Sequence, residues 1–203
     1  MNPPPRRGRR APGALLAAAL ALAVATAPLA HAAREFPAVG TIEIAFTPGD
    51  RVDAKIAAAI DGAEREVLVL AYSFTQPRIA RALTAAHERG VAVEVVADRG
   101  QTLELPHSEI PKLAGAGVPV WIDRGHGAAH NKVVVIDAGL PRATTITGSY
   151  NFTVAAQRKN AENVAIFRDN PDVANAYRTY FRRLQDKAVR WDGESGAMPR
   201  VPR

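Results

Sequence analysis

Residues 133–136, Val-Val-Val-Ile, constrain the fold of this chain more than any other stretch. Successive side chains of a strand point to opposite faces of its sheet, so a run of β-branched residues makes a strand that is apolar on both faces. Other elements must cover both faces, which favours a layered α/β domain. The polar residues directly before this strand are therefore held at the end of a buried element.

His130 and Lys132 lie on the same side of the extended chain at that end. The chain then turns, and a second strand at 143–147 can run back antiparallel and bring Ser149 and Asn151 beside the pair. Neutral imidazole can displace an alkoxide from phosphorus, while ammonium and amide groups hold the non-bridging oxygens, whose negative charge grows in the transition state. These groups are suited to attack on a phosphodiester, and we expect neither a metal nor another cofactor.

The motif resembles that of the phospholipase D superfamily. Its first part is HxKxxxxD, which begins at His130 and ends at Asp137, and its second part is GSxN, which begins at Gly148. The continuation at 152–163 is similar to small single-motif bacterial endonucleases of that superfamily, and the similarity extends over about 45–181. The resemblance implies a phospholipase D-like fold and a phosphodiesterase activity.

The resemblance also implies roles for individual residues. In the family the motif histidine is the nucleophile, the aspartate is more a structural anchor than a chemical group, and an acid farther along hydrogen-bonds a histidine. His130 matches the nucleophile, Asp137 the anchor and Glu162 the acid, while Lys132, Ser149 and Asn151 match phosphate-binding positions. The spacer of ten residues at 138–147 is longer than is common in the family. Because an insertion at a hairpin tip costs little, we expect a longer turn and an intact site.

The chain carries one HxK pair. In-line displacement at phosphorus needs a nucleophile on one side and an acid on the other to protonate the leaving oxygen. Larger superfamily members carry two motifs, and single-motif members pair two chains about a two-fold axis. The resemblance therefore implies a homodimer with merged sites, in which one His130 forms a phosphohistidine while the other donates the proton.

Residues 1–32 have the features of a secretory signal peptide, because four arginines precede an apolar run and alanines stand at positions 30 and 32. Cleavage after Ala32 would export a periplasmic or secreted protein, for which we expect no stable membrane association. The leader holds four arginines and no acid, so the remainder has 22 basic against 20 acidic residues. Net charge alone therefore does not indicate a nucleic-acid-binding surface. We expect a linker at 33–40, a phospholipase D-like catalytic domain at 41–191 and a disordered tail at 192–203.

Hydrophobic periodicity predicts strands that alternate with helices through the catalytic domain. The expected strands are 42–46, with Ile42, Ile44 and Phe46 on its apolar face, then 67–72, 91–97, 118–122, 133–136, 143–147 and 163–167. The expected helices are one capped by Asp50, one capped by Thr75, and 108–114, 151–157 and 171–190. This order predicts a mixed, mostly parallel β-sheet with helices on both faces and the site on loops at one edge.

Other interpretations remain for single features and for the substrate. The spacing of His126 and His130 suits a zinc pair on a helix, but Gly127 disfavours a helix there, and we expect a loop residue near the substrate. Asp98 is expected to start a simple turn. The substrate is DNA or RNA if the endonuclease resemblance holds. The alternatives are a lipid phosphodiester and a non-catalytic protein that binds nucleic acid.

Overall fold

The computed structural model describes Met1 and residues 33–191, so the rest of the expected signal peptide and the expected tail lie outside the described residues. The strands are β1 (Thr41–Thr47), β2 (Glu66–Ala71), β3 (Ala92–Asp98), β4 (Val120–Asp123), β5 (Lys132–Ile136), β6 (Thr144–Gly148), β7 (Glu162–Arg168) and β8 (Val189–Trp191). The helices are α1 (Val52–Asp61), α2 (Pro77–Glu88), α3 (Arg99–Leu103), α4 (Ile110–Gly115), α5 (Val154–Arg158) and α6 (Pro171–Gln185). The strands form one sheet in the order β1-β7-β6-β5-β2-β3-β4-β8.

The sheet is mixed, as expected, but the prediction that it is mostly parallel was wrong. The pairs β2–β3 and β3–β4 are parallel, and the other neighbouring strands in the described part of the chain are antiparallel. Parallel pairs need a crossover connection, which α2 supplies after β2 and α3 with α4 supply after β3. The link from β5 to β6 is a short turn, so these strands form a hairpin.

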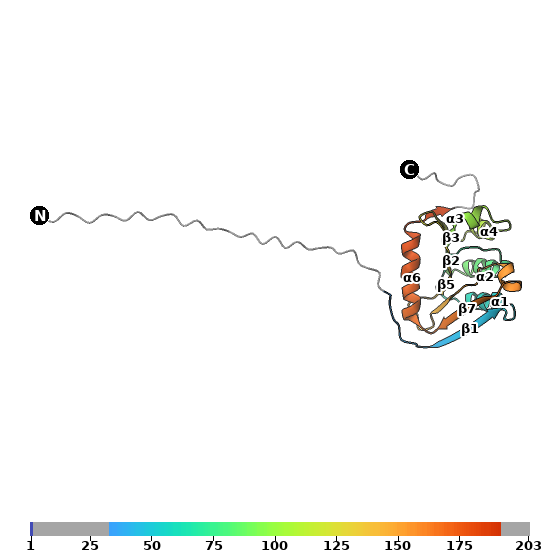
Figure 1. The fold of residues 1–203 in the computed structure, drawn as a ribbon, viewed down its shortest axis with the longest axis horizontal. Coiled ribbons are helices and arrows are strands. Elements are labelled where there is room, and N and C mark those ends of the chain that lie inside the picture. The colour runs from blue at the N-terminus through green and yellow to red at the C-terminus, as the bar shows by residue number, and fades with distance from the viewer. Residues whose placement is uncertain (2–32, 192–203) are drawn as a thin grey trace. The chain divides into compact units, whose positions relative to one another are not determined.

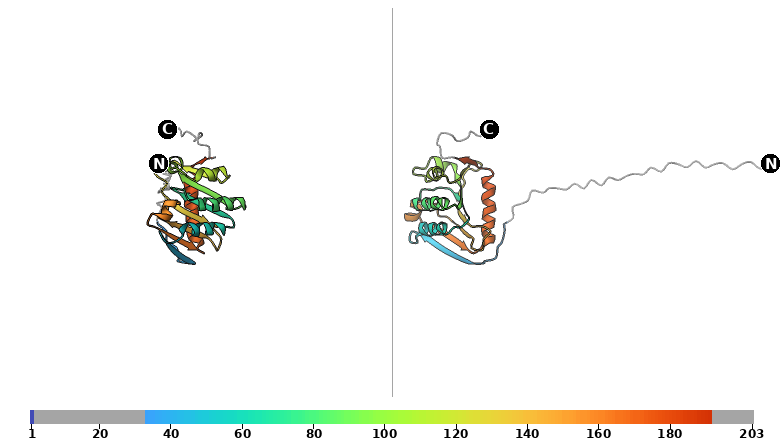
Figure 2. Two further views of the ribbon diagram at one scale, coloured as in Figure 1. Left: turned by 90° about the vertical axis from the view of Figure 1, so that its right-hand side faces the viewer. Right: turned by 180° about the vertical axis from the view of Figure 1, so that it is seen from behind.

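The strand predicted to be buried on both faces lies inside the sheet. All of β5 is buried, and it pairs with β6 on one side and β2 on the other. One face of the sheet packs against α1, α2 and α4, and the other face packs against α6. Figures 1 and 2 show these layers, with α6 on one side of the strands and α1 and α2 on the other. Helices on both faces of the sheet thus hold β5, and with it the site residues at its start, in a fixed position.

The first strand faces the opposite way from the prediction. Ile42, Ile44 and Phe46 are 52%, 53% and 58% exposed, whereas Ala45 and Thr47 are buried. Ala45 belongs to the same buried cluster as the apolar residues of α1. The large side chains point to the α6 side, but α6 packs across β6, β5, β2, β3 and β4. The α6 side of β1 is therefore an exposed apolar stripe.

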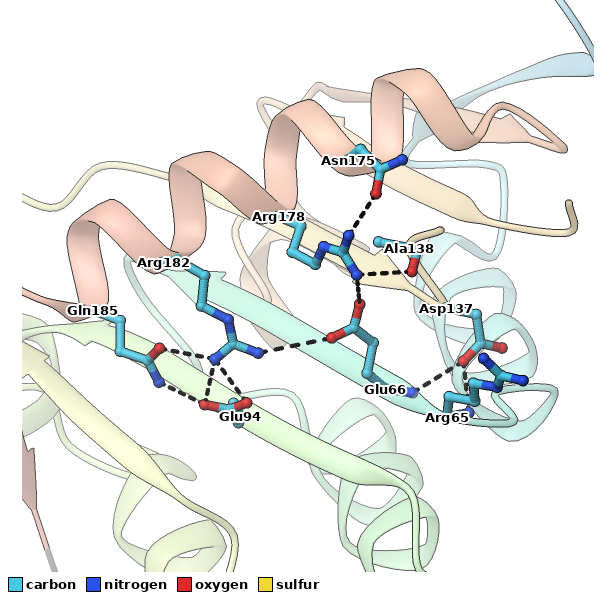
Figure 3. Close-up of polar contacts among 9 residues, drawn as sticks. All are labelled: Arg65, Glu66, Glu94, Asp137, Ala138, Asn175, Arg178, Arg182 and Gln185. Atoms are coloured by element: carbon cyan, nitrogen blue, oxygen red, sulfur yellow. Dashed lines mark hydrogen bonds and ion pairs between the residues drawn. The ribbon is translucent and has the colours of Figure 1, made fainter. Parts of the chain in front are cut away.

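Ion pairs fasten α6 across the beginnings of β2 and β3 (Figure 3). Arg182 lies 2.8 Å from Glu94 and 3.7 Å from Glu66, and Arg178 lies 3.3 Å from Glu66. The expected helix at 171–190 ends at Gln185, because the chain then forms β8 against β4. Arg182, in the second half of this helix, thus binds the helix to two strands of the sheet. Within residues 33–191, α6 and the other helices are all too short or too polar to cross a membrane.

Two expected helix caps were wrong. The N-cap of α1 is Arg51, without a side-chain cap, and the carboxylate of Asp50 instead accepts the backbone N–H of Phe46 at 2.9 Å. The N-cap of α2 is Gln76, because the N–H of Thr75 donates to the Phe152 carbonyl at 2.9 Å. Both expected cap residues hold neighbouring loops rather than helix ends.

Candidate active site

His130 and Lys132 converge on the ring of Tyr72, at the end of β2. The Tyr72 backbone N–H donates to the carbonyl of Asn131 at 2.9 Å, which ties the end of β2 to the start of β5. The imidazole of His130 stands edge-on to the Tyr72 ring, with centroids 4.4 Å apart. The Lys132 ammonium lies 4.8 Å from the centroid of the same ring. The histidine and lysine therefore share one side of the chain, as the strand geometry predicted.

Lys132 is a buried cation without a carboxylate partner at ion-pair distance in the described residues. It is 7% exposed, and its Nζ donates to the carbonyl of His130 at 3.0 Å. Burial lowers the pKa of Lys132, and the charge of Glu162 opposes this shift only in part. The face of the Tyr72 ring favours the ammonium form. An anion that entered this position would meet a fixed positive charge in partly desolvated surroundings.

The second half of the motif reaches the site through the β5–β6 hairpin. Val133 pairs with Thr147, so Gly148 lies opposite Lys132 and Ser149 follows directly. Within the ten-residue spacer, 138–143 form the turn and the remainder belongs to β6. The ten-residue spacer is thus divided between a turn and four residues of β6 that pair with β5.

Gly148 allows a close approach between β6 and β7. A Cβ at this position would lie 2.2 Å from the carbonyl oxygen of Asn163, so a larger residue would push the strands apart. This approach places Ser149 at the start of β7. Its Oγ donates to Glu162 at 2.6 Å and accepts the backbone N–H of Asn163 at 3.0 Å. Ser149 is thus oriented by the strand that carries Glu162.

Glu162 bonds to partners other than the expected histidine. Its carboxylate accepts from Ser149 and, at 3.0 Å, from the side chain of Asn160. Among the described residues the structure shows no hydrogen bond between Glu162 and His130. The reason is positional, because Glu162 begins β7 beside the Ser149 corner while the His130 ring stands on Tyr72. Within one chain Glu162 acts on Lys132 through its charge and on Ser149 through a hydrogen bond.

Asn151 presents a polar group without a partner. Its Oδ1 is buried and makes no hydrogen bond in the described part of the chain. The next residue, Phe152, forms a parallel bridge with Phe74, so the loop that carries Asn151 is tied to the segment after β2. Burial raises the pKa of the neighbouring Tyr150 phenol, which stays neutral at physiological pH. An unpaired carbonyl oxygen can accept a hydrogen bond from a donor group, whereas only the Nδ2 amide of Asn151 can donate to a phosphate oxygen.

Asp137 lies away from these groups. It follows the far end of β5, about 17 Å from Lys132 by strand rise. Its buried carboxylate accepts three backbone N–H groups, from Glu64 at 2.9 Å, Arg65 at 2.7 Å and Glu66 at 3.0 Å. Figure 3 shows it bonded to Arg65 and Glu66 at the start of β2, beside the Glu66 side chain that pairs with α6. Its position supports the anchor role and not contact with the reacting group.

Two buried carboxylates hold the loop that leads to His130. Asp98 caps α3 where a simple turn was expected, and its other oxygen accepts the Ala129 N–H at 2.8 Å. Asp123 accepts the backbone N–H of His126 at 3.1 Å and lies 2.9 Å from its imidazole Nδ1. His126 is therefore a loop residue, as expected, and its ring is directed to Asp123.

Sequence reasoning missed Tyr72, which contacts both motif side chains. Its only signal was its position, as the last residue of a continuous apolar run. The structure brings His130, Lys132 and Tyr72 together, joins Ser149 to Glu162, and separates Asp137 from both groups.

A family model described as "Cardiolipin synthase, PLD-like domain" matches residues 56–185, which is more than half of the chain. The chain belongs to the phospholipase D-like family. The matched region contains every motif residue from His130 to Glu162, whereas β1 and its apolar stripe lie before it.

Similar proteins include phospholipases D and a cardiolipin hydrolase by name. This phospholipase D-like chain is 40% identical over 136 residues to "Phospholipase D" of Rickettsia felis, which covers 67% of the chain and 65% of that protein. It is 34% identical over 138 residues to "Mitochondrial cardiolipin hydrolase" of Xenopus laevis. That match covers 68% of this chain and 63% of the Xenopus protein. The chain thus spans slightly less than two thirds of the length of these relatives.

Among solved structures, the phospholipase D family member Nuc from Salmonella typhimurium superposes with a TM-score of 0.68 at 30% identity. The match covers 74% of this chain and 97% of Nuc. It confirms the α/β fold class and shows that nearly all of Nuc has a counterpart here.

Proposed function

We propose that this phospholipase D-like protein is an exported phosphodiesterase that hydrolyses DNA or RNA without a metal, through a phosphohistidine. The observation that carries the proposal is the convergence of His130 and Lys132 on Tyr72, with a buried ammonium beside an exposed imidazole. A nucleophile and a fixed cation within reach of one phosphate are the two groups that attack on a phosphodiester needs most.

In this mechanism the imidazole of His130 attacks phosphorus while Lys132 holds a non-bridging oxygen. The P–O bond to the leaving alkoxide breaks, and His130 of the partner subunit donates a proton to that oxygen. The same partner imidazole then takes a proton from water, which attacks the phosphohistidine and releases the phosphomonoester. The Nδ2 amide of Asn151 donates a further hydrogen bond to a phosphate oxygen. The partner imidazole gives up one proton in the first step and regains one in the second, so the protons balance over one turnover.

The apolar stripe of β1 supports the homodimer that this mechanism needs. Ile42, Ile44 and Phe46 form a contiguous exposed apolar face, which is a common feature of protein interfaces. Phe46 pairs with Asn163, which donates to Ser149 and adjoins Glu162. An interface on this stripe would therefore lie next to the site and could bring two copies of His130 together.

The variant Phe46→Asp tests the dimer. We expect it to yield a folded monomer that has lost turnover, because a carboxylate would be buried against the partner's apolar stripe. Leu103→Asp is the matched control, because Leu103 is 42% exposed on α3 and should tolerate the charge. Light scattering gives the oligomeric state and circular dichroism the fold. A fully active wild-type monomer would contradict the shared site.

Nucleic acid is the favoured substrate because the segment after the motif resembles single-motif endonucleases and nearly all of Nuc is matched. A lipid phosphodiester is the second candidate, and the names of the similar proteins from Rickettsia felis and Xenopus laevis favour it. The chemistry at phosphorus is the same for both. The two substrates differ only in the parts of the molecule beyond the scissile phosphate, so contacts to those parts decide between them.

The test is incubation of the purified protein with single-stranded DNA, plasmid DNA, RNA and cardiolipin vesicles in excess EDTA. We expect cleavage of nucleic acid, which His130→Ala abolishes and His87→Ala leaves unchanged. His87 lies on α2 and contributes none of the site contacts described above. Turnover of cardiolipin alone would replace the nuclease proposal with the lipid one. Binding of nucleic acid without cleavage by the wild type would favour the non-catalytic alternative.

A further inference from the structure

A second group of basic side chains lies beside the proposed active site. Arg78 and Arg81 of α2 face Arg158 of α5 across an open pocket of about 280 Å³, whose lining also includes Asp53 and Gln157. All three arginines are exposed. None of them takes part in the contacts of His130 and Lys132, so the proposed chemistry leaves them unexplained.

Two chain segments lead from the active site to this pocket. One runs from Tyr72 to Arg78, and the other runs from Asn151 to Arg158. Between them Phe74 and Phe152 form a parallel bridge, with ring centroids 5.6 Å apart. The backbone N–H groups of residues 75 and 76 both donate to the Phe152 carbonyl at 2.9 Å. The two segments are thus held together and run in the same direction away from the site.

The pocket is close to the site. Val154 lines the pocket and stands three residues after Asn151. Three Cα–Cα steps span at most about 11 Å. A polymer whose scissile phosphate lies at Lys132 and Asn151 would therefore pass this pocket with a neighbouring part of its backbone.

The arrangement of charges suits a phosphate. The Nε of Arg78 donates to Asp53 at 2.9 Å, which fixes the guanidinium and leaves its terminal nitrogens available. Gln157 accepts the Asp53 backbone N–H and donates to the Asp50 carbonyl, both at 2.9 Å, and so holds α5 against α1. Among the described residues, Arg81 and Arg158 form no ion pair. One carboxylate thus faces three guanidinium groups, which bind phosphate oxygens with paired donors.

We propose that this arginine pocket binds a second phosphate of a nucleic acid strand, on one side of the scissile phosphate. The proposal rests on the proposed nuclease function and names how the strand is held. A phosphate contact away from the reacting atoms positions the substrate without reading its sequence. The pocket should therefore contribute to affinity and to its salt dependence rather than to the chemical step.

The experiment measures binding of a fluorescein-labelled single-stranded oligonucleotide by anisotropy at several salt concentrations, with His130→Ala in every protein so that the oligonucleotide stays intact. The test variant is Arg81→Ala with Arg158→Ala, and the charge-matched control is Arg65→Ala with Arg183→Ala. Arg65 precedes β2 at the opposite end of that strand from Tyr72, and Arg183 lies on α6. Thermal unfolding verifies that both variants are folded.

We expect the test variant to bind about tenfold more weakly, as for the loss of contacts to one charged group. The slope of log affinity against log salt should become shallower by about 0.7, the value for one phosphate contact on a single strand. The control should retain the wild-type affinity and slope. A test variant that matches the control in both quantities would overturn the proposal.

Two further measurements separate this proposal from the proposed function. If the wild type cleaves oligonucleotides and the test variant binds them as tightly as the control does, only the arginine pocket is wrong. If the wild type cleaves bis(p-nitrophenyl) phosphate but binds no oligonucleotide, the nuclease proposal and the pocket both fail, while the phosphodiesterase chemistry stands. Binding to phosphatidylglycerol vesicles that only the test variant loses, with oligonucleotide binding intact, would assign the pocket to a lipid headgroup and overturn the proposal.

Discussion

The anchor role of Asp137 predicts that Asp137→Ala reduces stability and leaves the chemistry intact. The substitution removes three backbone hydrogen bonds to a carboxylate. A hydrogen bond to a charged group contributes about 1.5–3 kcal/mol. Because Glu64 and Arg65 are exposed, water can replace the carboxylate at two of the three N–H groups, which reduces the expected loss to about 2–4 kcal/mol.

The backbone of residue 137 adds to this loss. Asp137 has φ of 52°, in the left-handed region, where alanine costs roughly 1 kcal/mol more than aspartate or asparagine. The total is about 3–5 kcal/mol, which for a domain of this size corresponds to a fall in Tm of roughly 10–15 °C. Asp137→Asn should lose less, because it tolerates the same φ and retains the oxygen that accepts two of the N–H groups.

The assay combines thermal unfolding with kcat measured well below the Tm of the variant. We expect kcat within about twofold of the wild type for Asp137→Ala, since no group of the reaction lies near residue 137. A large loss of kcat in a variant that is shown to be folded would refute the separation between anchor and site. An unchanged Tm would refute the stabilising role of the three hydrogen bonds.

Two further predictions concern the site itself. Burial lowers the pKa of Lys132 in the folded protein, so between that value and the ordinary 10.5 the unfolded chain binds more protons and stability rises with pH. Lys132→Met should remove this pH dependence, raise the free energy of unfolding at pH 7 and abolish turnover. Denaturant titrations at pH 7 and pH 10 measure the change in stability. A variant that is less stable than the wild type at pH 7 would contradict the prediction. Gly148→Ala should cost about 1–3 kcal/mol and most of the activity, because its Cβ would meet the Asn163 carbonyl at 2.2 Å. Gly115→Ala, where a Cβ meets nothing within 4 Å, is the matched control, and equal losses in the two variants would exclude the steric explanation.

Much of the fold follows from local patterns in the sequence. The apolar run at 133–136 located β5 as a strand buried on both faces, and hydrophobic periodicity predicted helices at α1 and α2, although not their caps. The position of His130 and Lys132 on one side followed from strand geometry alone. These features depend on residues close together in the chain, so sequence reasoning reaches them.

The features that were missed depend on long-range packing. Alternation in β1 showed that its two faces differ, but the face that meets α1 carries the small Ala45, and the large residues point to the half of the sheet that α6 leaves open. The prediction of mostly parallel strands was also wrong, because the residues within a strand do not determine which other strands pair with it. Tyr72 joined the site through a contact between β2 and β5 that no spacing reveals.

In the proposed reaction His130 carries the phosphoryl group during turnover. The most direct measurement is rapid acid-free quenching of the reaction with a cleavable diester, followed by proteolysis and mass spectrometry under alkaline conditions that preserve phosphohistidine. We expect phosphate, or the phosphorylated substrate fragment, on the peptide that contains His130, and none in His130→Ala. A covalent adduct on another residue, with His130 unmodified, would contradict it.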